Sequence, residues 1–461
     1  MTDKQLISVN PKNQSHINSW DIHSKIEINA IIKHTKDAQS SWKILSLSSR
    51  LNFIKKLAYN IEAKYKQLSI IMADEMGKPI RQGMSELKKC VWLCNYYIRN
   101  ASKFLSKKEI ESEFYKSYVS FQPIGIVLGI MPWNFPFWQV FRFAVPSLIV
   151  GNGVLLKHAS NVQGCANEIE NCFTEAGFPP FIFKNLRLPS SLISSVIKNH
   201  NVSGIALTGS TKAGKEVAKI SGKYLKKTVL ELGGNDPYLI LDDADIDIAV
   251  KACVDGRLLN AGQSCISAKR LIVTKKNVTN FTEKLIKLLN QKVVGDPFED
   301  VDMGPLVSKT ARDEVDALVK KSIRQGAILK MGGKIPKKEG SYYPITVLFD
   351  VKPGMAVFNK EVFGPVFSVI IAKNDNMAIK LANKNKFGLG SAIFTSDLEN
   401  GEKIANENLQ SGLCFVNEFV KSDPRLPFGG IKSSGYGREL SSYGLMEFVN
   451  IKTIVVGNSS T

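Results

Sequence analysis

The spacing of apolar positions changes along the chain, from a helical period in the first hundred residues to short strand-like runs after them. Between about Ser41 and Arg99 apolar residues recur at helical spacing, as in LNFIKKLAYNIEAKYKQLSIIMADEM, and Gly77 and Pro79 end that run. After a polar two-stranded candidate around FYKSYVSFQP, apolar runs such as IGIVLGI and GVLLKHA alternate with helical segments. Because such alternation is typical of parallel β/α layers, the sequence predicts an α/β fold.

Two alternating series follow one another and predict two lobes. The first includes SGIALTGS, a helix from Thr211 to about Ile220 and the strand KTVLEL, an order that suits a nucleotide-binding lobe. The second begins beyond Gly234 with PYLILDDADIDIAVKACVDGRLL and runs to about Glu439. The last residues, EFVNIKTIVVG, return to a strand pattern. No repeat or low-complexity linker separates the lobes, so we expect one continuous body.

Composition and charge add little to this description. The chain has 461 residues, 44% of them hydrophobic, with a formal net charge of +19. This charge is compatible with a nucleic-acid or membrane partner, or with a Lys-rich bias of the surface. The densest basic groups, SKKE and KIPKKEG, are short and interrupted, and no nucleic-acid motif occurs. We therefore expect a solvated surface and no nucleic-acid partner.

Several classes of protein are disfavoured by what the sequence lacks. The first residues have no apolar core of the kind that export requires, so a cytoplasmic enzyme is expected. The uncharged stretch 118–141 contains three prolines and runs into Arg142, which predicts a buried strand and loop and no membrane segment. The seven cysteines include no C-x-x-C and the five histidines have no ligand spacing, so neither a disulfide framework nor a metal site is expected.

Two short segments carry candidate catalytic side chains. In NAGQSCISAKR, Cys265 follows a Gly-Gln-Ser turn and precedes the strand-like run RLIVT, a position that suits a covalent nucleophile. In VLELGGNDPYLI, Glu231 closes an apolar run just before Gly233 and Gly234, which suits a buried general base. The other six cysteines are expected to be small buried hydrophobic residues.

These segments, with the loop PWNFP and the segments GSTKAG and NKEVFGPV, resemble those of the aldehyde dehydrogenase superfamily. The resemblance covers about 43–456, and the segments stand in the family's order. It implies an NAD(P)-binding domain over 1–111 and 124–232, a catalytic domain over 233–439, and bridging strands over 112–123 and 440–461. It also implies that the last strand joins the extension near 112–123 and adds to a neighbouring subunit, so a homo-dimer or homo-tetramer is expected.

The resemblance assigns roles to three residues. The Cys265 thiolate would attack the aldehyde carbon, and its backbone N–H with the Asn134 side chain would stabilise the oxyanion. Oxidation would leave a thioester on Cys265, which a water deprotonated by Glu231 would hydrolyse. Family members that pass the acyl group to coenzyme A generally lack this Glu, so Glu231 predicts a free carboxylic acid product.

A second set of residues would bind the cofactor, which the sequence leaves open as NAD or NADP. Lys157 would reach the adenosine ribose, Glu361 the nicotinamide ribose and Phe363 its ring. The full predicted set is Trp133, Lys157, Ser160, Gly209, Ser210, Leu232, Glu361 and Phe363. NAD-strict relatives carry Glu where this chain has Ser160, so NADP should be tolerated. His158, where relatives commonly have Pro, is either a surface imidazole or, when protonated, a phosphate contact.

The resemblance also predicts the substrate, most closely that of the shorter bacterial enzymes that oxidise succinate semialdehyde. Arg142 and Ser422 match positions that bind the distant carboxylate, a pairing that suits a small carboxylated aldehyde. Many such enzymes have a second Arg where this chain has Leu259. Arg257 either substitutes for it or is a solvated helix residue. Alternatively, Arg142 merely pairs with a nearby acid.

Other functions remain as alternatives. The chain could oxidise another semialdehyde or a small aliphatic aldehyde, which substitution of Arg142 would distinguish. A non-catalytic nucleic-acid-binding or structural relative is disfavoured by the intact set of Cys265, Glu231 and Asn134. A serine hydrolase is disfavoured because no G-x-S-x-G segment occurs.

Overall fold

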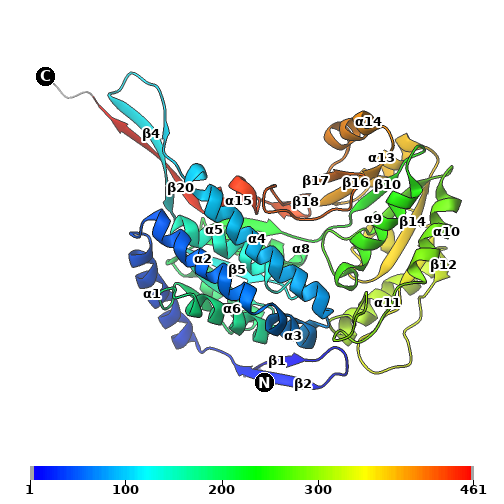
Figure 1. Cartoon of the computed structure of the whole chain (residues 1–461), viewed down its shortest axis with the longest axis horizontal. Helices are drawn as coiled ribbons and strands as arrows, with labels where there is room; N and C mark the ends of the chain where they lie inside the picture. The colour runs from blue at the N-terminus through cyan, green and yellow to red at the C-terminus, as the bar shows by residue number, and fades with distance from the viewer. Residues whose placement is uncertain (1–4, 458–461) are drawn as a thin grey trace.

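The computed structural model describes residues 5–457 and places two α/β lobes side by side, with a small sheet projecting from one of them (Figure 1). The first lobe is built on a six-stranded sheet. Its strand order is β19 (Gly435–Tyr436), β9 (Lys227–Glu231), β8 (Val202–Thr208), β5 (Ile126–Met131), β6 (Gly153–His158) and β7 (Phe183–Asn185). All neighbours are parallel except β19 and β9. The predicted α/β class is confirmed.

The helices of the first lobe surround this sheet. They are α1 (Lys25–Trp42), α2 (Leu47–Ala63), α3 (Tyr65–Met76), α4 (Ile80–Phe104), α5 (Trp138–Val150), α6 (Gln163–Glu175), α7 (Ile193–Lys198) and α8 (Thr211–Lys223). The predicted helical region thus begins earlier than expected, at α1. Its start is fixed by a capping box, in which Ser24 accepts from the Glu27 N–H and the Glu27 carboxylate accepts from the Ser24 N–H. A hairpin of β1 (Gln5–Val9) and β2 (His16–Asp21) precedes it.

The second lobe contains a seven-stranded sheet. Its order is β12 (Ile328–Met331), β13 (Thr346–Phe349), β14 (Val366–Ala372), β11 (Arg270–Thr274), β10 (Pro237–Ile240), β16 (Gly390–Phe394) and β17 (Leu413–Val416), with only the β12–β13 pair antiparallel. Its helices are α9 (Ile246–Leu258), α10 (Val278–Leu289), α11 (Lys309–Arg324), α12 (Ala356–Asn359), α13 (Asp375–Asn383) and α14 (Leu398–Lys403). β15 (Phe387–Gly388) pairs with β18 (Ile431–Lys432). The strands of both buried sheets are rich in β-branched residues and leucine, as expected for parallel strands covered on both faces.

The projecting sheet joins the two predicted bridging segments. β20 (Val449–Val456) pairs antiparallel with β4 (Lys116–Pro123) along its whole length, and β4 also pairs with β3 (Lys108–Glu109). α15 (Ser441–Met446) leads into β20. In Figure 1 this sheet extends away from both lobes at the upper left. The division into three domains remains a prediction, and β19, which lies inside 233–439, hydrogen-bonds to the six-stranded sheet of the first lobe.

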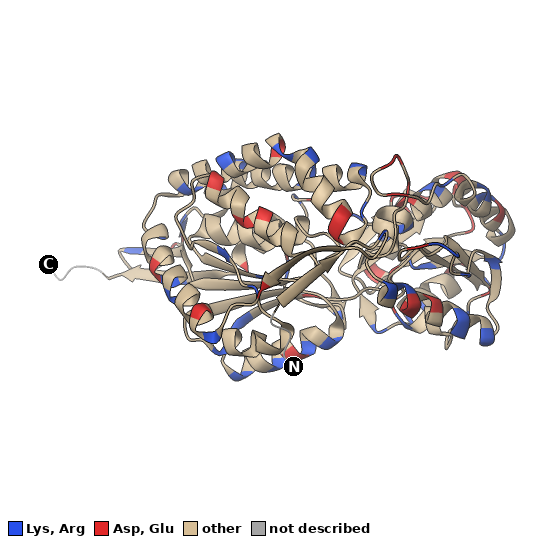
Figure 2. Ribbon diagram, turned by 90° about the horizontal axis from the view of Figure 1, so that it is seen from below, with Lys and Arg blue, Asp and Glu red and all other residues tan. Residues whose placement is uncertain are grey.

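Charged residues of both signs lie on both lobes. Figure 2 shows Lys and Arg scattered over both lobes, interspersed with Asp and Glu. No helix of residues 5–457 is long and apolar enough to cross a membrane.

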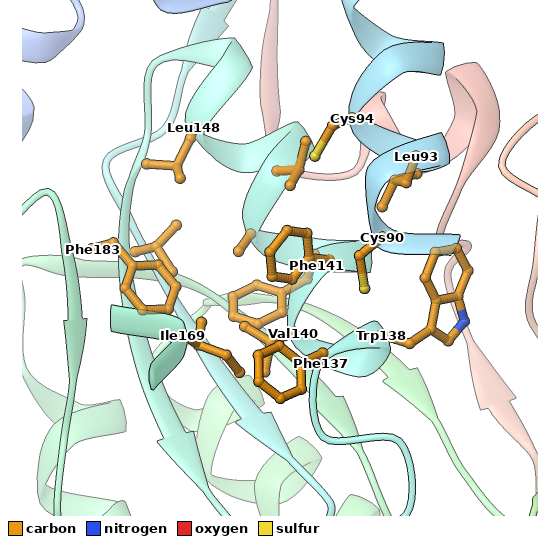
Figure 3. Packing of buried hydrophobic residues seen from close by; sticks show 14 of the residues in the cluster. Cys90, Leu93, Cys94, Phe137, Trp138, Val140, Phe141, Leu148, Ile169 and Phe183 are labelled. Atoms are coloured by element: carbon orange, nitrogen blue, oxygen red, sulfur yellow. The ribbon is translucent and has the colours of Figure 1, made fainter. Parts of the chain in front are cut away.

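Aromatic packing anchors the helices that flank the site. Phe137, Trp138 and Phe141, at the start of α5, pack against Cys90 and Cys94 of α4 in the core of the first lobe (Figure 3). Trp138 is 3% exposed and lies at the margin of this cluster, next to Cys90. The burial of large aromatic surface holds α4 and α5 at a fixed separation, which fixes the side chains that both helices present to the active-site region.

Candidate active site

Cys265 lies on a strained turn between α9 and β11. Asn260 and Ala261 have positive φ angles of 53° and 55°, a conformation that costs free energy in residues other than glycine. Gly262 also has a positive φ, and a Cβ there would collide with the carbonyl of Gly364. This turn brings Cys265 to the surface of a cavity, where it is partly buried.

The Cys265 thiol is protonated at neutral pH in this structure. Burial raises its pKa to about 12, while the positive charges of Lys269 and Arg142 act to lower it. A base or a bound ligand must therefore assist formation of the thiolate, which is the nucleophilic form.

Asn134 contacts the same turn, and its oxyanion role stays a prediction. Its Nδ2 donates to the backbone carbonyl of Gln263 at 3.0 Å, and the backbone carbonyl of Asn134 accepts from the Asn260 side-chain amide at 2.7 Å. Lys78 Nζ also donates to that carbonyl at 2.9 Å and forms a buried ion pair with Glu86. Because Glu86 accepts from the first N–H groups of α5, the Asn134 loop is fixed from both ends.

Lys269 ties the nucleophile turn to Glu361. It is 2% exposed, and its Nζ donates to the carbonyls of Ser264 at 2.8 Å and Cys265 at 2.6 Å. The same ammonium lies 3.6 Å from a carboxylate oxygen of Glu361, which in turn accepts from the Gly234 N–H at 3.1 Å. Sequence reasoning missed Lys269, although a lysine four residues after the nucleophile is visible in CISAKR.

We expect Lys269→Met to slow the reaction of Cys265 with iodoacetamide several-fold, because the cation that lowers the thiol pKa most is removed. Loss of its hydrogen bonds should also reduce the free energy of unfolding by about 1–3 kcal/mol. Alkylation rates across pH 7–10 measure the first effect and urea unfolding the second. The matched control is Lys276→Met, an exposed lysine nearby. Equal alkylation rates in wild type and Lys269→Met would contradict the assignment.

The predicted nucleophile and both predicted substrate-binding residues line the same cavity. Cys265, Arg142 and Ser422 line a pocket of about 760 Å³ including its mouth. Apolar side chains, among them Phe135, Trp138 and Phe419, form much of the rest of its wall. A largely apolar pocket with a few converging polar groups is the usual form of a small-molecule site.

Arg142 combines two of the alternatives derived from the sequence. It is 2% exposed, and its Nε lies 2.5 Å from Glu439, so it does pair with a nearby acid. It also lines the cavity, with its guanidinium 4.5 Å from the centre of the Phe428 ring, and its Nη2 is buried without a hydrogen-bond partner among residues 5–457. An unsatisfied buried donor of this kind is costly unless a ligand accepts from it.

Arg257 takes neither of its predicted roles. It is completely buried, so it is not a solvated helix residue, and it donates to Ser267 Oγ at 2.6 Å and to the Val362 carbonyl at 3.0 Å. These contacts direct it into the second lobe, away from the cavity. Leu259, the apolar residue at the position where many relatives have Arg, does line the cavity.

Glu231 lies at the end of β9, outside the lining of the cavity. It is 2% exposed, so the alternative of a surface carboxylate is wrong, and neither carboxylate oxygen has a hydrogen-bond partner among the described residues. Burial, followed by the negative charge of Glu439, raises its pKa well above the ordinary value. A carboxylic acid with a raised pKa is suited to proton transfer near neutral pH.

Most predicted cofactor residues gather at the carboxyl ends of the first lobe's strands. Gly209 donates to the carbonyl of Glu231 at 2.9 Å, Ser210 caps α8, and Leu232 packs against Gly214 of α8. The rings of Trp133 and Phe363 meet edge to face, with centroids 5.7 Å apart. This edge of a parallel sheet is where α/β proteins bind nucleotides.

The Lys157 side chain fits a cofactor at this edge. It is 6% exposed, and its ammonium forms no hydrogen bond or ion pair with any of residues 5–457. Burial alone lowers its pKa. A buried cation without a protein partner can be satisfied by the hydroxyl or phosphate oxygens of a nucleotide. Ser160 is exposed, so a 2′-phosphate near it would meet no carboxylate from that residue.

The prediction for His158 is wrong. It is 1% exposed, with its ring nitrogens 3.2 Å from the Met131 carbonyl and 3.0 Å from the Pro136 carbonyl. Burial lowers its pKa to about 4, so it is neutral at physiological pH. His158 therefore supports the Asn134 loop and carries no charge for a phosphate.

Comparison with known proteins agrees with this arrangement. A family model described as "Aldehyde dehydrogenase family" matches residues 1–454. The chain belongs to the aldehyde dehydrogenase family. It is 40% identical over 450 residues to a protein of Synechocystis named "Probable succinate-semialdehyde dehydrogenase [NADP(+)]", covering 97% of this chain and 99% of that one.

Further relatives of this aldehyde dehydrogenase carry similar names. The chain is 38% identical over 449 residues to "Succinate semialdehyde dehydrogenase [NAD(P)+] Sad" of Escherichia coli, covering 97% of each. Among solved structures, it matches succinic semialdehyde dehydrogenase from Streptococcus pyogenes in complex with NADP+, with a TM-score of 0.96 and 34% identity. That match covers 98% of this chain and 100% of the other.

The aldehyde dehydrogenase site also contains polar residues of α4 that sequence reasoning missed. Gln82, Ser85, Glu86 and Lys89 all line the cavity. Their spacing of three, four and seven residues places them on one face of a helix, so a polar face on this helix could have been predicted from the sequence. The sequence does not show that this face lines the cavity, because that depends on how α4 packs.

Proposed function

We propose that this aldehyde dehydrogenase oxidises a small carboxylated aldehyde to the free acid, with succinate semialdehyde as substrate and succinate as product. The observation that supports the substrate class is the presence of Arg142 and Ser422 in the same cavity as Cys265. Guanidinium and hydroxyl donors beside an apolar wall suit an aldehyde with a short carbon chain and a distant carboxylate. The names of the relatives agree with this proposal.

The residues divide the reaction between them. Cys265 attacks the aldehyde carbon, and its backbone N–H with the Asn134 amide stabilises the oxyanion. NAD+ or NADP+, when bound, supplies the hydride acceptor. Glu231 then takes a proton from the water that hydrolyses the Cys265 thioester, which releases the acid.

The cofactor would be held mainly by the first lobe, with Glu361 contributed by the second. Lys157 would contact the adenosine portion, Ser210 the phosphates at the start of α8, and Glu361 the nicotinamide ribose. Because Ser160 stands where NAD-strict relatives have Glu, we propose that NADP+ is accepted.

A homo-dimer or homo-tetramer is also proposed. The outer strand β20 exposes Ile451 (61%), Val455 (48%) and Val456 (42%), which are costly to leave in water along an open strand edge. A second copy pairing with this sheet would cover them.

Reduced-cofactor formation at 340 nm tests the proposal. Succinate semialdehyde and uncarboxylated aldehydes would each be supplied with NAD+ and with NADP+. We expect kcat/KM to be highest for succinate semialdehyde and turnover to occur with NADP+. Turnover confined to uncarboxylated aldehydes would support the dehydrogenase mechanism and contradict the proposal that the substrate is carboxylated.

We expect Arg142→Gln to raise the KM for succinate semialdehyde by about 10–100-fold, because a charged donor to the substrate carboxylate is lost. Since the substitution leaves Glu439 buried without its partner, the double variant Arg142→Gln/Glu439→Gln serves as the stable comparison. The KM for butanal should be little changed in the double variant. An equal rise for both aldehydes would argue for a purely structural role of Arg142.

A further inference from the structure

Lys89 is a cation in the substrate cavity that no carboxylate of the described residues neutralises. It extends from α4 and lines the cavity together with Cys265 and Arg142. Among residues 5–457 no Asp or Glu forms an ion pair with it. Its ammonium instead donates to Ser422 Oγ at 2.7 Å and lies 4.7 Å from the centre of the Trp138 ring. A partly buried ammonium with only a hydroxyl and an aromatic ring as partners retains protons to donate.

The nearby acids are already committed to other cations. Asp423 accepts from Arg425 through both of its oxygens, at 2.9 and 2.6 Å. Glu86 is paired with Lys78, and Glu439 with Arg142. Arg142 and Glu439 therefore cancel as charges. Lys421, which also lines the cavity, is paired with Glu418 at 2.7 Å, so Lys89 is left as the lining cation without a carboxylate partner among the described residues.

Lys89 also determines what Ser422 can do. The Ser422 oxygen accepts from Lys89 and from Trp138 Nε1, the latter at 3.1 Å. A hydroxyl oxygen accepts at most two hydrogen bonds, so the remaining capacity of Ser422 is to donate its own proton. Figure 3 shows that Trp138 is fixed at the margin of the packed aromatic cluster, which holds this arrangement in place. Among the described residues, Lys89, Ser422 and the Nη2 of Arg142 are therefore three donors without an anionic acceptor.

We propose that Lys89 is the residue that selects carboxylated aldehydes, by supplying the unpaired positive charge that binds the distant carboxylate and by orienting the Ser422 hydroxyl toward it. This inference rests on the proposed function. It places the second cation of the carboxylate site on α4. The position six residues before the nucleophile holds Leu259, and the Arg257 side chain is directed away from the cavity.

The charge of Lys89 gives the proposal a pH dependence. Burial, together with the positive charge of Arg142, lowers the pKa of Lys89 to about 8 against the opposing effect of Asp423, Cys90 and Glu86. The protonated form binds the anion. The kcat/KM for succinate semialdehyde should therefore decline as pH rises through about 8, in a step that is absent for butanal.

Three variants test the proposal. Lys89→Met removes the charge at similar length, Lys89→Arg retains it, and Lys88→Met removes the exposed neighbouring lysine as a control. We expect Lys89→Met to lower kcat/KM for succinate semialdehyde by about 10–100-fold through KM, with butanal turnover unchanged. Lys89→Arg should recover most of the loss and shift the alkaline decline to higher pH, while Lys88→Met should match wild type.

The outcomes separate this inference from the proposed function. A wild type that prefers succinate semialdehyde, with a Lys89→Met variant that keeps this preference, would overturn the role of Lys89 alone. A wild type without that preference would overturn the proposed substrate as well. Equal losses for both aldehydes in Lys89→Met would show that the residue is structural, which also overturns the proposal.

Discussion

Cys265→Ala is expected to abolish aldehyde oxidation, with kcat reduced by about 10⁴-fold or more, because no covalent intermediate can form without the thiol. The fold should be preserved, since Cys265 is partly buried at the cavity and its main hydrogen bond, from Lys269, is made by the backbone carbonyl. Steady-state formation of reduced cofactor at 340 nm measures the loss, and quenching of tryptophan fluorescence measures retained cofactor binding.

A matched control comes from the only other cysteine of residues 5–457 that is not fully buried. Cys414 lies on β17, and its thiol pKa is raised by burial. Cys414→Ala should retain wild-type kcat. If Cys265→Ala kept activity within tenfold of wild type while Cys414→Ala lost it, the nucleophile would be misassigned.

The second large effect is expected for Glu231→Gln. The carboxylate oxygens of Glu231 have no hydrogen-bond partner among the described residues, so an isosteric amide should not disturb the fold. Hydrolysis of the thioester should slow, and kcat should fall by about 10²–10⁴-fold. Rapid mixing should then show a burst of one equivalent of reduced cofactor per site, followed by slow turnover. Mass spectrometry should detect the acyl group on Cys265.

The pH dependence gives an independent check on Glu231. As a base it must be deprotonated, and burial with Glu439 raises its pKa well above the ordinary value, so wild-type hydrolysis should accelerate as pH rises through that raised pKa. Glu231→Gln should lose this acceleration, whereas Glu216→Gln, at an exposed position of α8, should retain it. A burst equally large in wild type, or no burst in Glu231→Gln, would show that hydrolysis does not depend on Glu231.

The sequence by itself determined the features that depend on local pattern. The spacing of apolar residues and the turn residues located the β/α alternation of both lobes, and the helix predicted from Thr211 to about Ile220 is α8, which spans Thr211–Lys223. The loop around Cys265 and the end of the strand at Glu231 were also visible, because the residues that shape each turn are neighbours in the chain. α1 was missed although the capping box at Ser24 and Glu27 was readable.

Only the tertiary structure decided how the long polar side chains are used. Lys89 meets Ser422 across 333 residues of sequence, and Arg142 on α5 pairs with Glu439, which lies between β19 and α15. Arg257 is drawn away from the cavity by Ser267 and Val362. The physical reason is that a charged side chain goes where its desolvation is best compensated, and the compensating groups come from elements that are adjacent only after packing.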